Sequence, residues 1–78
     1  MKYFVNVFST SAKFGTLERQ MERRFGETDG SGYCFVDGER DVQWVRETLG
    51  NALRLRASIR AAAKKARVRV RVEVVSLD

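Results

Sequence analysis

The sequence predicts an α+β domain, a small two-layer sandwich in which helices pack on one face of a β-sheet. Three observations lead to this prediction: each end of the chain shows strand-like alternation, a helix-like apolar stripe follows the first strand, and no linker divides the 78 residues. A chain of this length builds one modest core, so residues 1–78 are expected to form a single domain. The expected element order is strand, helix, strand, helix, helix, strand, with three strands in the sheet.

The first strand and the first helix are predicted from the spacing of their apolar residues. Segment 2–9 carries bulk on both faces, which is typical of a central strand, with Tyr3, Val5 and Val7 on one face and Phe4 and Phe8 on the other. Thr16 is the expected N-cap of the following helix, and Gly26 is the expected terminating residue. The helix is predicted from one apolar stripe along this segment, formed by Phe14, Leu17, Met21 and Phe25.

The middle of the chain permits two interpretations. A β-prone run at 33–36 follows a turn-rich segment and is expected to be a strand. For residues 39–49, a helix is indicated by the spacing of Val42, Val45 and Leu49. A strand is indicated by the alternation of Val42 and Trp44, in which case Asp37 and Gly38 close a tight hairpin. The sheet would then have four strands and be ferredoxin-like, so residues 40–45 stay open between helix and strand.

The C-terminal half is expected to contain a helix break and a final strand. One helix over 39–66 would be about 42 Å long, far longer than the first strand at about 27 Å. Because the apolar stripe shifts near Gly50 and Asn51, two short helices are expected to meet there. The last strand is predicted from strict alternation, with Val68, Val70, Val72 and Val74 between Arg67, Arg69, Arg71 and Glu73.

The distribution of charge is the main functional clue. Residues 1–38 carry five basic and five acidic side chains, so the net charge of +5 comes from the rest of the chain. Such segregation produces a directed field that attracts phosphates or acidic protein surfaces. Eight cations lie between positions 54 and 71 with no carboxylate among them, and they are the expected partner-binding surface: Arg54, Arg56, Arg60, Lys64, Lys65, Arg67, Arg69 and Arg71.

The residues that usually carry catalysis are scarce. The chain has no His, the commonest general base and metal ligand. Cys34 is the only cysteine, so it has no thiolate partner for a metal and no His to activate it. We therefore expect no enzyme activity, no metal and no cofactor. A single thiol and the lack of a long apolar run favour a cytoplasmic protein that does not enter membranes.

Residues 32–36 resemble a known family. Their order of glycine, aromatic, small, aromatic and valine resembles the signature of the RNA-recognition motif, with Tyr33 and Phe35 at its base-stacking positions. Segments 3–5, 17–26 and 39–50 are similar to that family's first strand, first helix and second helix. The chain departs from the pattern at Ser31, where the family has a basic residue, and at Gly38, where it has an aromatic one. The resemblance implies RNA binding with Phe4 and Tyr33 stacking on bases.

A second resemblance concerns the type of protein. A small domain without prolines or catalytic motifs, with its charge on one side, resembles the anti-CRISPR proteins of phages and mobile elements. That resemblance implies a stoichiometric inhibitor in the host cytoplasm, which blocks a CRISPR effector or similar nucleic-acid-handling complex through its basic surface. The alternative is a free-standing RNA- or DNA-binding module. The expected partner has an acidic or phosphate-bearing surface, and the oligomeric state stays open between a monomer and a dimer through an edge strand.

Overall fold

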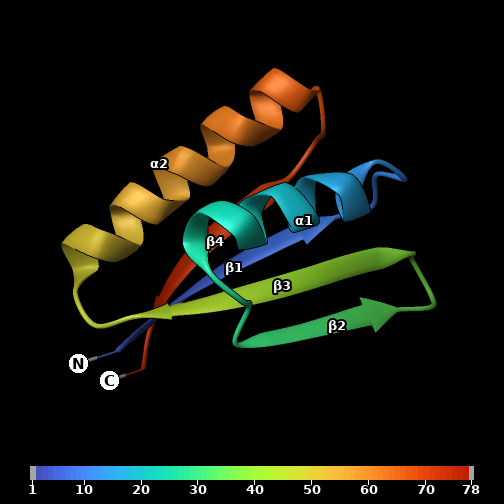
Figure 1. The fold of residues 1–78 in the computed structure, drawn as a ribbon. Coiled ribbons are helices and arrows are strands. Elements are labelled where there is room, and N and C mark those ends of the chain that lie inside the picture. Colours follow the sequence, from blue (N-terminus) through green and yellow to red (C-terminus); the bar gives the residue numbers. More distant parts are fainter. Residues whose placement is uncertain (1, 78) are drawn as a thin grey trace.

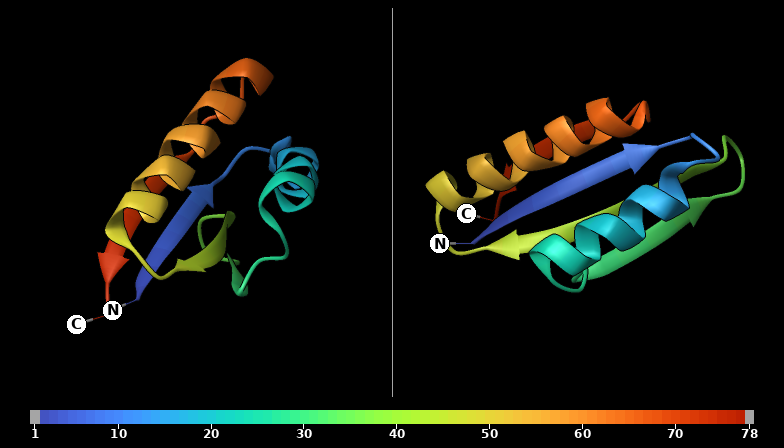
Figure 2. Two further views of the ribbon diagram at one scale, coloured as in Figure 1. Left: turned by 60° about the vertical axis from the view of Figure 1, so that its left-hand side comes forward. Right: turned by 45° about the horizontal axis from the view of Figure 1, so that its top comes forward.

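The computed structural model describes residues 2–77 as two helices and four strands (Figure 1). Both helices lie on the same face of one sheet in each view of Figure 2, which confirms the predicted two-layer α+β sandwich. The elements, in chain order, are β1 (Tyr3–Ser9), α1 (Phe14–Phe25), β2 (Gly30–Cys34), β3 (Glu39–Arg46), α2 (Leu49–Ala66) and β4 (Arg71–Ser76).

The sheet is antiparallel, with the strand order β2-β3-β1-β4. β1 pairs with β3 on one side and with β4 on the other, so its predicted central position is confirmed. This order and the βαββαβ sequence of elements define the split βαβ arrangement, the four-stranded ferredoxin-like form. β2 and β4 are the two edges of the sheet.

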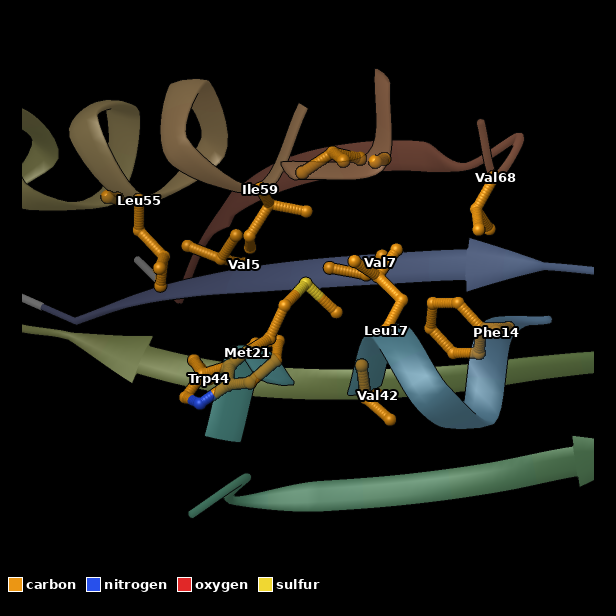
Figure 3. Close-up of a cluster of buried hydrophobic side chains, with 13 residues drawn as sticks. Val5, Val7, Phe14, Leu17, Met21, Val42, Trp44, Leu55, Ile59 and Val68 are labelled. Carbon is orange, nitrogen blue, oxygen red and sulfur yellow. The ribbon is translucent and has the colours of Figure 1, made fainter. Parts of the chain in front are cut away.

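One face of the sheet and the inner sides of both helices form the core. Val5 on β1 lies opposite Trp44 on β3 and Val74 on β4, which fixes the register of the buried face. Figure 3 shows Val5 and Trp44 among the buried side chains between the sheet and the helices, where Trp44 and Ile59 are fully buried. The helices contribute Phe14, Leu17 and Met21 from α1 and Ala52, Leu55, Ile59 and Ala63 from α2. Each set follows helical spacing, so one stripe of each helix is buried.

Two polar contacts fix α1 on the sheet. The indole N–H of Trp44 donates a hydrogen bond to the carbonyl oxygen of Gly26 at 3.0 Å, just beyond the end of the helix. The Trp44 ring also meets the Phe25 ring edge to face, with centroids 6.3 Å apart. Near the middle of the helix, Arg40 donates two hydrogen bonds to the Glu18 carboxylate, at 2.6 and 3.0 Å. These contacts connect α1 to β3 and so position the outer surface of the helix.

The interpretation of residues 39–49 as a helix is wrong. They form β3 and the start of α2, and the hairpin alternative is the correct one. Gly38 adopts a positive φ of 71° in that hairpin, and the amide of Glu39 donates to the Asp37 carboxylate at 2.9 Å. The expected break at Gly50 and Asn51 is also absent from the described structure, since α2 is continuous and its N-cap is Thr48, whose hydroxyl accepts from the Asn51 amide.

Three element boundaries differ from those expected. α1 starts at Phe14, with Lys13 rather than Thr16 at its N-cap position, although Gly26 does follow its end. The second strand spans Gly30–Cys34 and not residues 33–36, so Phe35 lies in the hairpin turn and is 91% exposed. The last strand starts at Arg71 and not at residue 67, because residues 67–70 connect the end of α2 to the sheet.

Candidate functional site

The α2 helix carries five of the eight cations predicted to bind a partner. Arg54, Arg56, Arg60, Lys64 and Lys65 all lie on this helix, which contains no Asp or Glu. Arg56 is partly exposed and the other four are exposed, since the buried stripe uses the small or apolar positions between them. The two lysines occupy the last turn, where positive charge is favoured by the helix dipole.

The five cations of α2 lie on two flanks of the helix. Lys65 lines a hollow together with Arg24 of α1, so its flank faces α1. Arg54 precedes Lys65 by about three turns on the same side, at about 100° per residue. The remaining three follow one another at intervals of four residues on the opposite flank, which we call the outer row: Arg56, Arg60 and Lys64.

Arg67 and Arg69 continue the positive charge beyond the helix. Arg67 has a left-handed backbone, with φ 56°, and its amide donates to the carbonyl oxygens of Ala63 and Lys64. This conformation ends α2 and turns the chain back toward the sheet. Arg69 is exposed, and its carbonyl oxygen accepts a hydrogen bond from the buried Ser9 hydroxyl at 2.7 Å. Both arginines are therefore placed by backbone contacts. The Arg69 side chain lines a hollow with Phe8, Glu39 and Arg71, so it lies beside the sheet and not on the helical surface.

Arg71 lies on the other side of the molecule. It pairs in register with Phe8, and its neighbour Val72 is buried beneath the helices, so Arg71 projects from the sheet face that no helix covers. Its guanidinium lies 4.4 Å from the centroid of the Phe8 ring. It also forms ion pairs with Glu39 at 3.7 Å and with Glu73 at 3.5 Å. The eight cations thus do not form one surface, because Arg71 is separated from α2 by the sheet and is partly neutralised.

The uncovered face of the sheet, which we call the open face, is predominantly acidic. Arg71 is accompanied there by Glu39, Asp41 and Glu73, whose positions all alternate with helix-facing residues. Between them, the Gln43 amide donates to the Asn6 side-chain oxygen at 2.9 Å. Arg69 also lines a hollow there with Phe8, Glu39 and Arg71, so three carboxylates stand against two guanidiniums. The small negative balance makes this face less favourable for phosphates than the helices.

The two aromatic residues expected to stack on bases lie on opposite faces. Phe4 pairs with Val45 on the open face, whereas Tyr33 pairs with Arg40 on the helix-covered face. Tyr33 instead contacts Phe35, with ring centroids 5.0 Å apart. The segment that resembles the RNA-recognition signature therefore occupies β2 and the hairpin turn, at an edge of the sheet. Its aromatics and Phe4 form no common platform.

A groove between α1 and α2 contains functional candidates that the sequence did not indicate. Two adjoining hollows, of about 360 and 200 Å³, share Gln20 and Ala66. We call them together the interhelical groove. Its cations are Lys13 and Arg24 from the α1 side and Lys65 from α2, while its remaining lining residues are Thr16, Leu17, Gln20, Met21, Ala62, Ala66 and Val68. Ala62 and Ala66, on the flank of α2 opposite the outer row, are the sequence feature that could have indicated the groove, because their small side chains leave space beside α1.

The acids of α1 do not line this groove. Glu18 is bound by Arg40 of β3, and that hydrogen-bonded guanidinium holds the pKa of Glu18 below its ordinary value. The same pairing raises the pKa of Arg40. The carboxylate is thus ionised but directed toward the sheet, so it does not neutralise the groove. Away from the groove, the Glu39 amide that donates to Asp37 lowers the pKa of that carboxyl in the hairpin turn.

Residues 2–77 show no cluster of three or more His, Cys, Asp or Glu side chains that could hold a metal ion. Cys34 is a free, exposed thiol at the end of β2. Neither helix of the described chain has the length and apolar character needed to cross a membrane. The expectations of no metal, no cofactor and no enzyme activity stay predictions.

Comparison with known proteins gives a fold but no function. No protein-family profile and no curated protein matches the chain. Among solved structures, the chain is similar to the X-ray crystal structure of protein Atu4242 from Agrobacterium tumefaciens, a structural genomics target, with a TM-score of 0.59 and 14% sequence identity. The similarity covers 97% of this chain and 92% of Atu4242. At this identity the likeness supports the α+β fold alone.

Proposed function

We propose that this protein is a small, non-enzymatic binding protein that docks on the phosphates of a nucleic acid through its two helices. The observation that carries the proposal is the separation of charge by the sheet. With three Arg and two Glu in α1, and five cations and no acid in α2, the two helices have a net charge of +6, more than the +5 of the whole chain. The remainder of the molecule, including the open face, is therefore slightly negative.

This separation gives the protein a preferred orientation toward a polyanion. The cations of the helical side attract phosphates, and the carboxylates of the open face repel them. The outer row supplies three exposed or partly exposed cations on one flank of α2, at helical neighbour spacing. Arginine side chains also make bidentate contacts to phosphate oxygens, which suits Arg56 and Arg60.

An inhibitor of anti-CRISPR type is the narrower form of this proposal. Such a protein would cover RNA or DNA held within a CRISPR effector or similar complex, with its helices against the nucleic acid. The size of the chain and its one-sided charge support this form. The alternative, a module that stacks bases on its sheet, has less support, because Arg71 covers the ring of Phe8 and carboxylates surround it.

The proposal is tested by fluorescence anisotropy with labelled single-stranded RNA, single-stranded DNA and duplex DNA over a salt series. With about five phosphate contacts to a single strand, log K should fall with log salt at a slope of roughly −3.5. The double variant Arg56→Glu/Arg60→Glu should weaken binding strongly. Lys2→Glu changes an exposed cation outside both helices and serves as the control for net charge, with Arg60→Glu as its single-substitution match on α2. Absence of salt-dependent binding to any nucleic acid would refute the proposal.

The inhibitor form is tested by affinity capture from a lysate of cells that contain a CRISPR effector, with and without nuclease treatment. Retention of the effector only while its nucleic acid is intact supports docking on phosphates. Retention that survives nuclease treatment would instead indicate an acidic protein surface and contradict the proposed mode of docking.

A further inference from the structure

The interhelical groove has the shape and lining of a ligand site. Its two hollows, of about 360 and 200 Å³, adjoin at Gln20 and Ala66 and extend along the junction of α1 and α2. Together they fall within the range of about 300–1,000 Å³ in which proteins bind small organic ligands. The groove exists because Ala62 and Ala66 present only methyl groups to α1.

The lining combines an apolar floor with a cationic rim. Leu17 and Met21 are almost fully buried and form the floor. Lys13, Arg24 and Lys65 line the hollows, and none of them takes part in the ion pairs found in residues 2–77. An unneutralised cluster of cations beside apolar surface is suited to a ligand that has an anionic group and a flat, weakly polar body.

The position of Gln20 adds a requirement on the ligand. Its exposed side chain borders both hollows, and an amide can donate and accept hydrogen bonds at once. Such a group recognises the edge of a base or a sugar hydroxyl rather than a phosphate alone. Phosphate, hydrogen-bonding edge and flat apolar surface are together the chemistry of a nucleotide.

We infer that the interhelical groove binds nucleotide units of a single strand, with phosphates on Lys13, Arg24 and Lys65 and the base against the apolar floor. This inference rests on the proposed function and locates the contact. A single strand can turn its bases into a groove, whereas a duplex keeps them stacked inside and presents only phosphates to the rim. The inference therefore requires a preference for single strands over duplexes of equal length.

Two neighbouring lysines provide the sharpest test. Lys64 lies on the outer row and Lys65 in the groove, so Lys65→Glu and Lys64→Glu make the same charge change on opposite flanks of one helical turn. Lys65→Glu should weaken binding of a labelled single strand about tenfold and binding of a duplex less. Lys64→Glu should weaken both by about threefold, because the outer row contacts the phosphates of either form. Anisotropy at fixed salt measures both.

A second pair of variants tests the groove without any change of charge. Ala62→Leu places a larger side chain in the groove, while Ala61→Leu adds the same atoms to an exposed position. With circular dichroism showing both variants folded, only Ala62→Leu should reduce single-strand binding.

Competition with AMP or UMP then identifies the source of the nucleotide. Displacement of the strand indicates that a free nucleotide is sufficient for binding. No displacement indicates that the nucleotide must be part of a strand.

The outcomes separate this inference from the proposed function. Equal losses within both pairs, or equal affinity for single strands and duplexes, overturn the groove while leaving phosphate docking on the helices in place. A wild-type protein that binds no nucleic acid at any salt concentration overturns both. Selective losses in Lys65→Glu and Ala62→Leu support the groove.

Discussion

Replacement of Glu18 by Gln should destabilise the protein by about 1–2 kcal/mol at neutral pH. The carboxylate accepts two hydrogen bonds from Arg40, and the side chains of Glu18 and Arg40 are 13% and 38% exposed. Exposed ion pairs contribute about 0.2–1 kcal/mol, and hydrogen bonds to charged groups about 1.5–3 kcal/mol. A partly buried pair with two bonds lies between these limits. The melting temperature should accordingly fall by about 4–16 °C in a domain of this size.

The effect should depend on pH in a defined direction. Arg40 lowers the pKa of Glu18 from its ordinary value of 4.5, so folding favours the ionised carboxylate. The stabilisation is then fully present above the unfolded pKa and is lost as the pH falls through the lowered pKa of the folded state. The variant carries a neutral amide at every pH. The stability difference between Glu18→Gln and wild type should therefore shrink steadily in acid.

Thermal unfolding followed by circular dichroism at pH 7 and in acid measures this difference. Glu27→Gln is the matched control, since Glu27 is exposed, lies between α1 and β2, and takes no part in the hydrogen bonds of Arg40 to Glu18. A double-mutant cycle with Arg40→Gln isolates the pairwise energy. Equal melting temperatures for Glu18→Gln and wild type at pH 7 would refute the reasoning, as would a difference that persists unchanged in acid.

Three further predictions follow from the structure. Trp44→Phe removes the hydrogen bond to Gly26 and part of a fully buried ring, so urea unfolding should show a loss of about 2–3 kcal/mol, and an unchanged midpoint would contradict the role of Trp44. Arg67→Gly should increase the free energy of unfolding by up to about 1 kcal/mol, because glycine adopts the left-handed conformation more readily. The melting temperature should therefore rise, and a decrease would contradict this reasoning. Cys34 should react with a thiol reagent in the native state, whereas labelling only in denaturant would show that it is protected.

The strands and helices were predictable where a single periodicity fits the residues. The alternation of segment 2–9 and the stripe of α1 each match one element only, and both are present in the structure. Residues 39–49 fit both periods, because Val42 belongs to the helical stripe and to the alternation. The choice is made by long-range pairing, in which Val42 lies opposite Val7 and Trp44 opposite Val5. The residues of segment 39–49 alone do not indicate which residues of β1 they pair with.

The candidate site was predictable in composition but not in arrangement. Lys64 and Lys65 are adjacent in sequence, and only the position of α1 shows that they lie on different flanks of α2. For Arg71 the sequence contained a usable signal. A side chain that alternates with buried valines must point away from the core, and the helices cover the core face. Arg71 therefore had to project from the face opposite α2, away from the five cations of that helix.

The arrangement of charge also explains why the helices, rather than the sheet, are the surface to test first. In a two-layer domain one face of the sheet is free to bind, and in this protein Phe4, Phe8 and Asn6 lie on it. A single strand laid there would bring its phosphates close to Glu39, Asp41 and Glu73, at an electrostatic cost that the already paired Arg71 does not offset. The helical side offers the five cations of α2, a helix without acids, and a groove that is not filled by side chains. Under the proposed function, electrostatic attraction would therefore bring a polyanion to α2 before any contact with a base is made.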